Sequence, residues 1–297
     1  MSEDVRPAPT GAIHDIGYRH YDGPRLGAAY IWRSLFVETL RGTYGLGRSA
    51  RSKVMPFLLL AVMVLPAATI GIVTGYFGFR ELPLGYTSYV FALQIPVTIF
   101  VASQSPVAMS RDLRFRVAPL YFSRPLSRQQ YVQAKYAAMA TALFILMGLP
   151  LTLLFAGALL AELPIEDQLP DYLRSMAGAA IHGAVLAGIG LAIAALTPRR
   201  GLGVAAVVGV LLVLSGIQAT VRAMAEELGN DTFAGYAGLI SPFSLVDGVM
   251  AGPVGAESVM AVGPQEPWAS AVFCAVAVLL VVGCYAALLT RYRKALS

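Results

Sequence analysis

The chain has 297 residues, of which 57% are hydrophobic and only 13% are charged, and its formal net charge is +5. This length allows one helical bundle without a further soluble domain of any size. The basic residues stand beside apolar stretches and form no continuous patch, which argues against nucleic-acid binding. The first 25 residues are polar and proline-rich and lack the apolar region of a signal peptide.

Residues 1–53 are expected to form a cytoplasmic N-terminal segment. Its first part is punctuated by proline and glycine and should be extended. His14, Asp15, His20 and Asp22 cluster there and raise the alternative of a metal site. No further well-spaced ligand stands nearby, so a solvated or partner-docked polar stretch is expected instead of a metal.

From Gly27 to Leu46, apolar residues recur at helical spacing with charged residues off that stripe. Nothing else in a soluble domain is available for such a helix to pack against, so it is expected to lie in the inner membrane interface. The residues predicted to face the membrane are Ile31, Trp32, Leu35, Phe36 and Leu40.

Gly42 to Ser49 reads G-x-x-x-x-G-R-S, one residue away from a phosphate-binding P-loop. A P-loop needs a buried strand before it and a lysine for the phosphates. Here a helical segment comes first and Arg48 replaces the lysine, so no nucleotide is expected to bind.

Six uncharged stretches follow, each as long as the roughly 20 residues that cross a bilayer. They predict a six-helix transmembrane domain over residues 54–297, in an all-α integral membrane protein. The stretches are Val54–Phe79, Leu82–Ser110, Tyr136–Ala161, Ser175–Pro198, Gly201–Val221 and Pro267–Thr290. Prolines in the first two predict kinks. Small residues four positions apart predict close helix contacts at Gly71/Gly75, Ala184/Gly188 and Ala205/Gly209.

The charges between these stretches sort by side. Segments 1–53, 110–135, 199–200 and 291–297 hold 19 of the 22 Lys and Arg residues, whereas the alternate gaps hold 11 of the 17 acidic residues. Basic residues remain on the cytoplasmic side of a membrane, so both termini are expected inside.

The longest outer segment, residues 222–266, is too short for a domain. Thr220–Leu228 and Pro242–Met250 are expected to form short helices before the sixth span. Phe233–Ile240 between them is apolar enough to dip back into the outer leaflet.

The apolar stretches contain no Asp, Glu, Lys or Arg, so they hold no proton relay or ion-pair switch of the secondary-transporter kind. His182 stands alone in the fourth stretch, and either a hydrogen bond to a neighbouring helix or a function would explain it. Cys274 and Cys284 are too far apart on one helix to form a disulfide. The chain carries no catalytic motif and is not expected to be an enzyme, and any energy for transport would have to come from another subunit.

The loop of residues 110–135 mixes arginines with apolar and aromatic side chains. A positive-inside loop needs the arginines, but the apolar residues favour insertion into a groove on a cytoplasmic protein. Ser127 and Gln130 form a capping box that should start the helix of the third span. The residues expected to contact the partner are Arg111, Asp112, Arg114, Phe115, Arg116, Leu120, Tyr121, Phe122 and Arg124.

This loop resembles that of the ABC-2 family of ABC-transporter permeases, which have the six-helix type V exporter fold. The matching residues, in order, are Leu120, Ser123, Pro125, Leu126, Ser127, Arg128, Tyr131 and Lys135. The segment from Asp15 to Gly27 is similar to the entry segment common in actinobacterial members, and that from Ile240 to Gly248 to the family's short outer helices. In this family the loop holds the coupling helix, which sits in a cleft of the ATPase subunit.

The resemblance implies a multi-pass permease subunit of an ATP-driven exporter in the bacterial cytoplasmic membrane. Its partners would be two copies of an ABC ATP-binding subunit, a second permease chain (identical or paralogous) and membrane lipid. ATP and Mg would be bound by the ATPase, and this chain would hold no cofactor. The uncharged spans favour a hydrophobic or amphipathic cargo (drug, lipid or peptide), as in multidrug efflux. The alternative is a membrane sensor or immunity-type protein that binds a hydrophobic ligand without moving it.

Overall fold

The computed structural model describes residue 23 and residues 26–110, 112, 126–197, 199–252, 254–256, 258–259 and 268–294. All regular structure among them is helical. In chain order the elements are α1 (Ala28–Thr43), α2 (Ala50–Phe77), α3 (Tyr86–Ala92), α4 (Gln94–Ser105), the π-helical turn η1 (Pro106–Ser110), α7 (Arg128–Leu160), α8 (Ile165–Leu196), α9 (Arg200–Glu227), α10 (Asp231–Tyr236), the 3-10 turn η2 (Ala237–Leu239), α11 (Pro242–Ala251) and α12 (Ala269–Lys294).

Five of these helices, α2, α7, α8, α9 and α12, are long and apolar enough to cross a membrane. Two bent pairs pass the same test together: α3 with α4 and η1, bent by 56°, and α10–η2 with α11, bent by 117°. The described chain therefore has between five and seven candidate spans. Such a set of long apolar helices defines an α-helical membrane protein.

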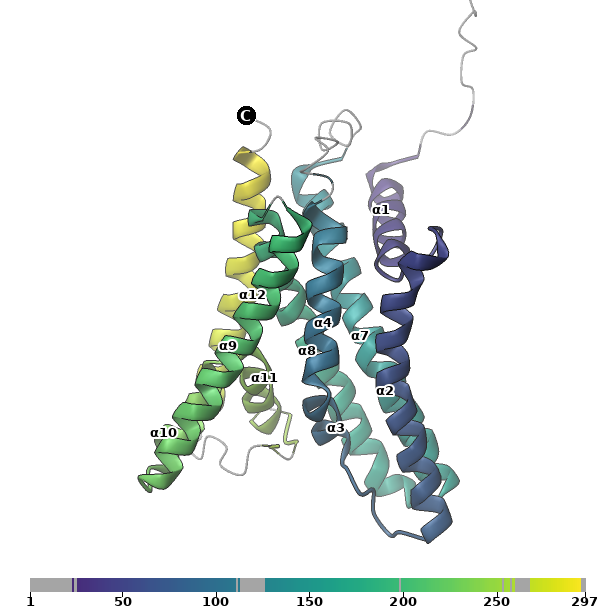
Figure 1. Cartoon of the computed structure of the whole chain (residues 1–297), viewed down its shortest axis with the longest axis vertical. Coiled ribbons are helices and arrows are strands. Elements are labelled where there is room, and N and C mark those ends of the chain that lie inside the picture. The colour runs from purple at the N-terminus through teal and green to yellow at the C-terminus, as the bar shows by residue number, and fades with distance from the viewer. Residues whose placement is uncertain are drawn as a thin grey trace, which may run out of the picture.

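The core lies along α8, which packs on α7, α9, α11 and α12. Over its most apolar 18 residues, α8 is 67% buried inside the bundle, whereas α9 and α12 are each only 17% buried over theirs. In the view of Figure 1, α9 and α12 diverge from α2 and α7 toward the lower end, and α11 lies in the angle between them. Helices α9 and α12 thus keep broad apolar faces that the described chain does not cover.

The second predicted span is not one continuous helix. Helix α3 ends at Ala92, and α4 begins two residues later with a 56° change of direction. Pro96 explains the break, because it has no N–H to donate to the carbonyl of Ala92 and its ring crowds that carbonyl. The prolines of the first span have no such effect, since α2 continues through Pro56 and Pro66.

Two of the three small-residue pairs mark close helix contacts, as predicted. A Cβ added to Gly71 of α2 would lie 2.9 Å from the Cα of Gly157 in α7, so the two backbones touch. A Cβ on Gly188 of α8 would lie 2.8 Å from the Tyr136 hydroxyl. The third prediction is wrong for Gly209, because none of the described neighbouring atoms lies within 4 Å of an added Cβ there.

The outer segment is also partly different from the prediction. The expected short helix over Thr220–Leu228 is wrong, because α9 continues unbroken to Glu227. No proline or glycine interrupts the helix there, and an ion pair of 2.7 Å between Arg222 and Glu226 supports its last turns. The short helix predicted at Pro242 is confirmed as α11.

Candidate functional site at the arginine-rich end

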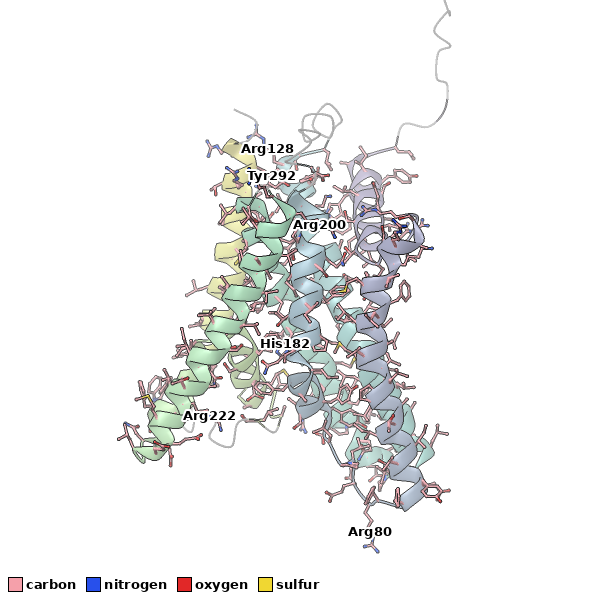
Figure 2. All side chains as sticks on the ribbon, in the orientation of Figure 1. Arg80, Arg128, His182, Arg200, Arg222 and Tyr292 are labelled. Carbon is pink, nitrogen blue, oxygen red and sulfur yellow. The ribbon has the colours of Figure 1, made fainter. Side chains whose placement is uncertain are left out.

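Basic residues gather at one end of the helices. Figure 2 shows Arg128 and Arg200 near the upper end, whereas Arg80 and Arg222 lie at the lower end. We name the upper end the arginine-rich end. Helix α7 starts here, and the chain reaches it from α4 through η1. The predicted partner-binding loop is therefore attached to the bundle at this end.

Helix α7 begins at Arg128 because Ser127 caps it. The Ser127 Oγ accepts a hydrogen bond from the Gln130 backbone N–H (3.2 Å), and the Gln130 Oε1 accepts one from the Ser127 N–H (3.0 Å). This reciprocal bonding satisfies N–H groups that a helix start leaves free, and it confirms the predicted capping box. Because the helix starts before the apolar stretch does, Tyr131 and Lys135 lie in its first turns.

Asp112, Tyr131 and Lys135 form a compact polar cluster, which we name the root clasp. The Lys135 Nζ lies 2.8 Å from the Asp112 Oδ2, and the Tyr131 hydroxyl donates to the same oxygen at 2.5 Å. The side chains of Lys135 and Asp112 are only 8% and 15% exposed. An ion pair withdrawn from water leaves an uncompensated charge if one partner is removed. The root clasp thus connects Asp112, at the start of the loop, to α7, the helix that follows the loop.

The π-helical turn η1 supplies two further acceptors to this region. The Lys135 Nζ donates to the carbonyl of Ala108 at 2.9 Å, and the Tyr292 hydroxyl donates to that of Met109 at 3.5 Å. The turn begins at Pro106, which has no N–H to continue the α-helical bonding pattern. Side chains from α7 and α12 therefore hold η1 in place.

Helix α12 joins the same region through Tyr292. The Tyr292 and Tyr131 ring centroids are 5.2 Å apart, and both side chains are fully buried. The neighbouring Arg291 donates from Nε to the carbonyl of Ala195 at 3.1 Å, in the last turn of α8. Carbonyls in a last helical turn have no partner within their own helix, so this bond satisfies one of them. The ends of α7, α8 and α12 are thereby linked around the root clasp.

Helix α1 packs on α7 and not wholly on lipid, which corrects the expected orientation of its apolar stripe. Leu35 is buried. The other four predicted residues are half-buried and pack against the core; they are Ile31, Trp32, Phe36 and Leu40. The ring of Trp32 stacks on that of Phe36 with centroids 5.5 Å apart. Part of the stripe is thus used for contact with the bundle.

Tyr44 anchors the end of α1 to α7. Its hydroxyl donates to the carbonyl of Ala142 at 2.8 Å, and its ring lies 5.6 Å from that of Phe100. Burial raises the pKa of the Tyr44 phenol above its usual range, so the hydroxyl keeps its proton and its hydrogen bond at physiological pH.

The opposite face of α1 borders an open hollow of about 600 Å³. Arg33, Arg41 and Arg48 line it, together with Glu38 and exposed apolar side chains. The P-loop-like segment forms part of this hollow, with helix α1 before it and no strand among the described residues preceding it. The arrangement combines positive charge with apolar surface at the arginine-rich end.

Of the nine residues predicted to contact a partner, only Asp112 belongs to the described part of the chain, and it lies in the root clasp. The other eight lie outside the described residues: Arg111, Arg114, Phe115, Arg116, Leu120, Tyr121, Phe122 and Arg124. Sequence reasoning gave Tyr131 and Lys135 no role beyond a motif match. Their spacing of four residues, which places them on one helix face, could have indicated that they act together.

A second polar cluster lies where α3, α8 and α11 meet. His182, midway along the bundle in Figure 2, and Asp247 of α11 line one cavity of about 20 Å³. Both side chains are buried, at 8% and 3% exposure. His182 is alone within its own apolar stretch, but the packing of α11 on α8 brings Asp247 to the same cavity. A single acidic residue in an otherwise apolar run was the signal that was missed. His14 and His20, with the metal site they raised as an alternative, lie outside the described residues.

No protein-family model matches the chain, and no curated protein matches its sequence. The class of protein is therefore defined by the fold: an α-helical, multi-pass membrane protein. Its described residues contain no group of three or more His, Cys, Asp or Glu side chains that could hold a metal ion.

Proposed function

We propose that this chain is the membrane subunit of an ATP-driven exporter of the ABC-2 type, powered by a separate ATPase. The observation that carries the proposal is the root clasp. It joins both ends of the loop that contains Arg116 and Tyr121 to the bundle through a shielded ion pair of 2.8 Å. A force applied to that loop by a partner would therefore move η1 and α7 together instead of bending a free loop.

The proposed topology has six spans with both termini in the cytoplasm. Counting the bent pair Tyr86–Ala92 and Gln94–Met109 as one span adds a sixth to the five long helices. The pair Asp231–Leu239 and Pro242–Ala251, bent by 117°, is then an outer hairpin that enters the membrane and returns. The gathering of arginines at one end supports placing that end in the cytoplasm.

The proposed partners follow from the surfaces at the arginine-rich end. The loop would insert its aromatic and arginine side chains into a cleft of the ATPase, and α1 would make a second contact beside it. The arginine-lined hollow on α1 is suited to lipid headgroups. The largely uncovered apolar faces of α9 and α12 favour a second permease chain and an amphipathic or hydrophobic cargo.

Co-expression with the candidate ATPase and reconstitution in liposomes test the proposal. We expect the ATPase to co-purify at near-equal stoichiometry. Arg116→Glu and Tyr121→Ala should each reduce transport at least tenfold while the chain remains in the membrane, because aromatic and arginine side chains dominate binding energy at such contacts.

Arg80→Glu and Tyr76→Ala are matched controls, since they change the same residue types in exposed positions. Arg80 lies at the other end, and Tyr76 is in the last turn of α2. Both controls should transport normally. Normal transport by the two loop variants would contradict the coupling role of the loop. A chain that binds a hydrophobic ligand but retains no ATPase would instead support the membrane-sensor alternative.

A further inference from the structure

Asp247 is a buried carboxylate held by the chain just beyond α11. Its Oδ2 accepts a hydrogen bond from the Ser258 hydroxyl at 2.7 Å, and its Oδ1 accepts one from the Val259 N–H at 3.0 Å. Two hydrogen bonds stabilise the ionised form, but a negative charge withdrawn from water still favours a positive partner. No ion pair joins Asp247 to a Lys or Arg among the described residues.

His182 lines the same cavity as Asp247. Its Nδ1 lies 3.1 Å from the carbonyl of Gly178, one turn earlier in α8. A carbonyl oxygen only accepts hydrogen bonds, so Nδ1 must carry a proton. The remaining nitrogen, Nε2, is then the atom at which this imidazole gains or loses its second proton.

The two side chains share a small polar cavity. Its polar lining also includes Thr87 and Ser175, whose hydroxyl oxygens are 3.1 Å apart, and the rest is apolar. A volume of about 20 Å³ accommodates one water molecule, which needs about 10–15 Å³ and several polar partners. A water molecule held here would connect the Asp247 carboxylate to the imidazole.

Helix α11 is seated closely against its neighbours at this point. A Cβ on Gly178 of α8 would lie 3.2 Å from the Met250 side chain, and one on Gly248 would lie 2.2 Å from the ring of Phe273 in α12. Glycine at both positions lets α11 fit between α8 and α12. Asp247 therefore lies on a helix that is packed closely against both α8 and α12.

We propose that His182 and Asp247 together bind one proton, and that this proton fastens α11 to α8. Binding adds the proton to Nε2 and gives an imidazolium–carboxylate pair with no net charge. Release returns the proton to water and leaves a neutral imidazole beside a negative carboxylate, which loosens the contact. No other titratable side chain of α3, α8 or α11 lines the cavity, and on α12 the nearby titratable group is Cys274, in the cluster around Phe273.

The three histidines of the chain make a direct test possible, and it requires neither an ATPase nor a cargo. The variant His14→Gln/His20→Gln, labelled with ¹⁵N-histidine and placed in nanodiscs, reports on His182 alone. Its nitrogen chemical shifts give the ratio of protonated to neutral imidazole as a function of pH. We expect this ratio at a fixed pH to fall about tenfold or more when Asp247→Asn is added, because a negative charge that lines the same cavity favours the imidazolium.

Asp171→Asn is the matched control, since it makes the same change at an exposed aspartate and should leave the ratio unchanged. An unchanged ratio in Asp247→Asn overturns the proposal. So does an imidazole that stays neutral across the whole pH range in the parent. Neither result bears on export, so failure of this inference is distinguishable from failure of the proposed function.

A reciprocal measurement covers the case in which Asp247→Asn fails to fold. At a pH where His182 is protonated in the parent, His182→Gln should raise the protonated fraction of Asp247, read from its ¹³C carboxyl signal. Because the two protonation equilibria are coupled, the effect must be reciprocal. The factor by which His182→Gln changes the ratio of protonated to ionised Asp247 should equal the factor by which Asp247→Asn changes the ratio of protonated to neutral His182. An unchanged carboxyl signal would rule out the shared proton.

Discussion

Lys135 places a positive charge about two turns inside a long apolar helix. The Asp112 carboxylate, 2.8 Å away, and the Ala108 carbonyl, 2.9 Å away, compensate for its removal from water. The Tyr131 hydroxyl bonds to the same carboxylate, so each group of the root clasp depends on the others. Such shared dependence makes the clasp sensitive to the loss of any single member.

Lys135→Met should therefore lower the free energy of unfolding by about 3 kcal/mol, because Asp112 would keep a shielded charge without its partner. Unfolding in detergent, followed by circular dichroism, measures the loss. Arg128→Met, on the same helix but exposed, should change stability by no more than about 0.5 kcal/mol. Equal effects of the two substitutions would mean that the ion pair contributes nothing to stability.

Helices α2 and α7 cross where Gly71 meets Gly157. The close approach of the two backbones depends on the absence of side chains, since added Cβ atoms would lie 2.9 and 2.7 Å from the opposite Cα. Without water to drive association, helices in a membrane gain most of their attraction from such close packing. This crossing attaches α2 to the helix that also carries the root clasp.

Gly71→Ala should weaken this crossing and lower the free energy of unfolding by about 1–3 kcal/mol, because the backbones must separate. Gly209→Ala is the matched control, since an added methyl there meets none of the described atoms within 4 Å. It should be neutral or stabilising by up to about 1 kcal/mol, because alanine favours a helix more than glycine does. The same unfolding assay compares the two variants, and a neutral Gly71→Ala would contradict the tight crossing.

The molecule as a whole has two chemically different ends. The arginine-rich end holds Arg128 and Arg200, the root clasp and α1, whereas Arg80 and Arg222 mark the other end. Toward that other end α9 and α2 diverge, and α11 lies in the angle between them. This difference between the ends predicts one fixed orientation in a membrane.

Cysteine labelling in whole cells measures that orientation. In a Cys274→Ser/Cys284→Ser background, Arg80→Cys should react with a membrane-impermeant thiol reagent in intact cells. Arg200→Cys should react only after permeabilisation, because positive charge is retained on the cytoplasmic side. Labelling of Arg200→Cys in intact cells would reverse the proposed topology.

Hydropathy and helix-start signals were sufficient to predict much of the fold. Five of the six apolar stretches correspond to long helices, the capping box at Ser127 starts α7, and α11 begins at Pro242 as expected. These features depend on residues that are neighbours in sequence, so a local pattern determines them. The partner-binding surface predicted in the loop rests on eight residues outside the described part of the chain and stays a prediction.

Contacts between distant residues were decided only by the tertiary structure. Asp112 meets Lys135 across the loop, and Asp247 shares a cavity with His182 because α11 turns by 117° from α10–η2 and packs on α8. No local pattern encodes either pairing, since each depends on how separate helices pack. The sequence alone determined which segments are helical and which end carries the positive charge, because hydropathy and charge are properties of single residues. Packing determined where buried charges find partners, because that requires the positions of several helices at once.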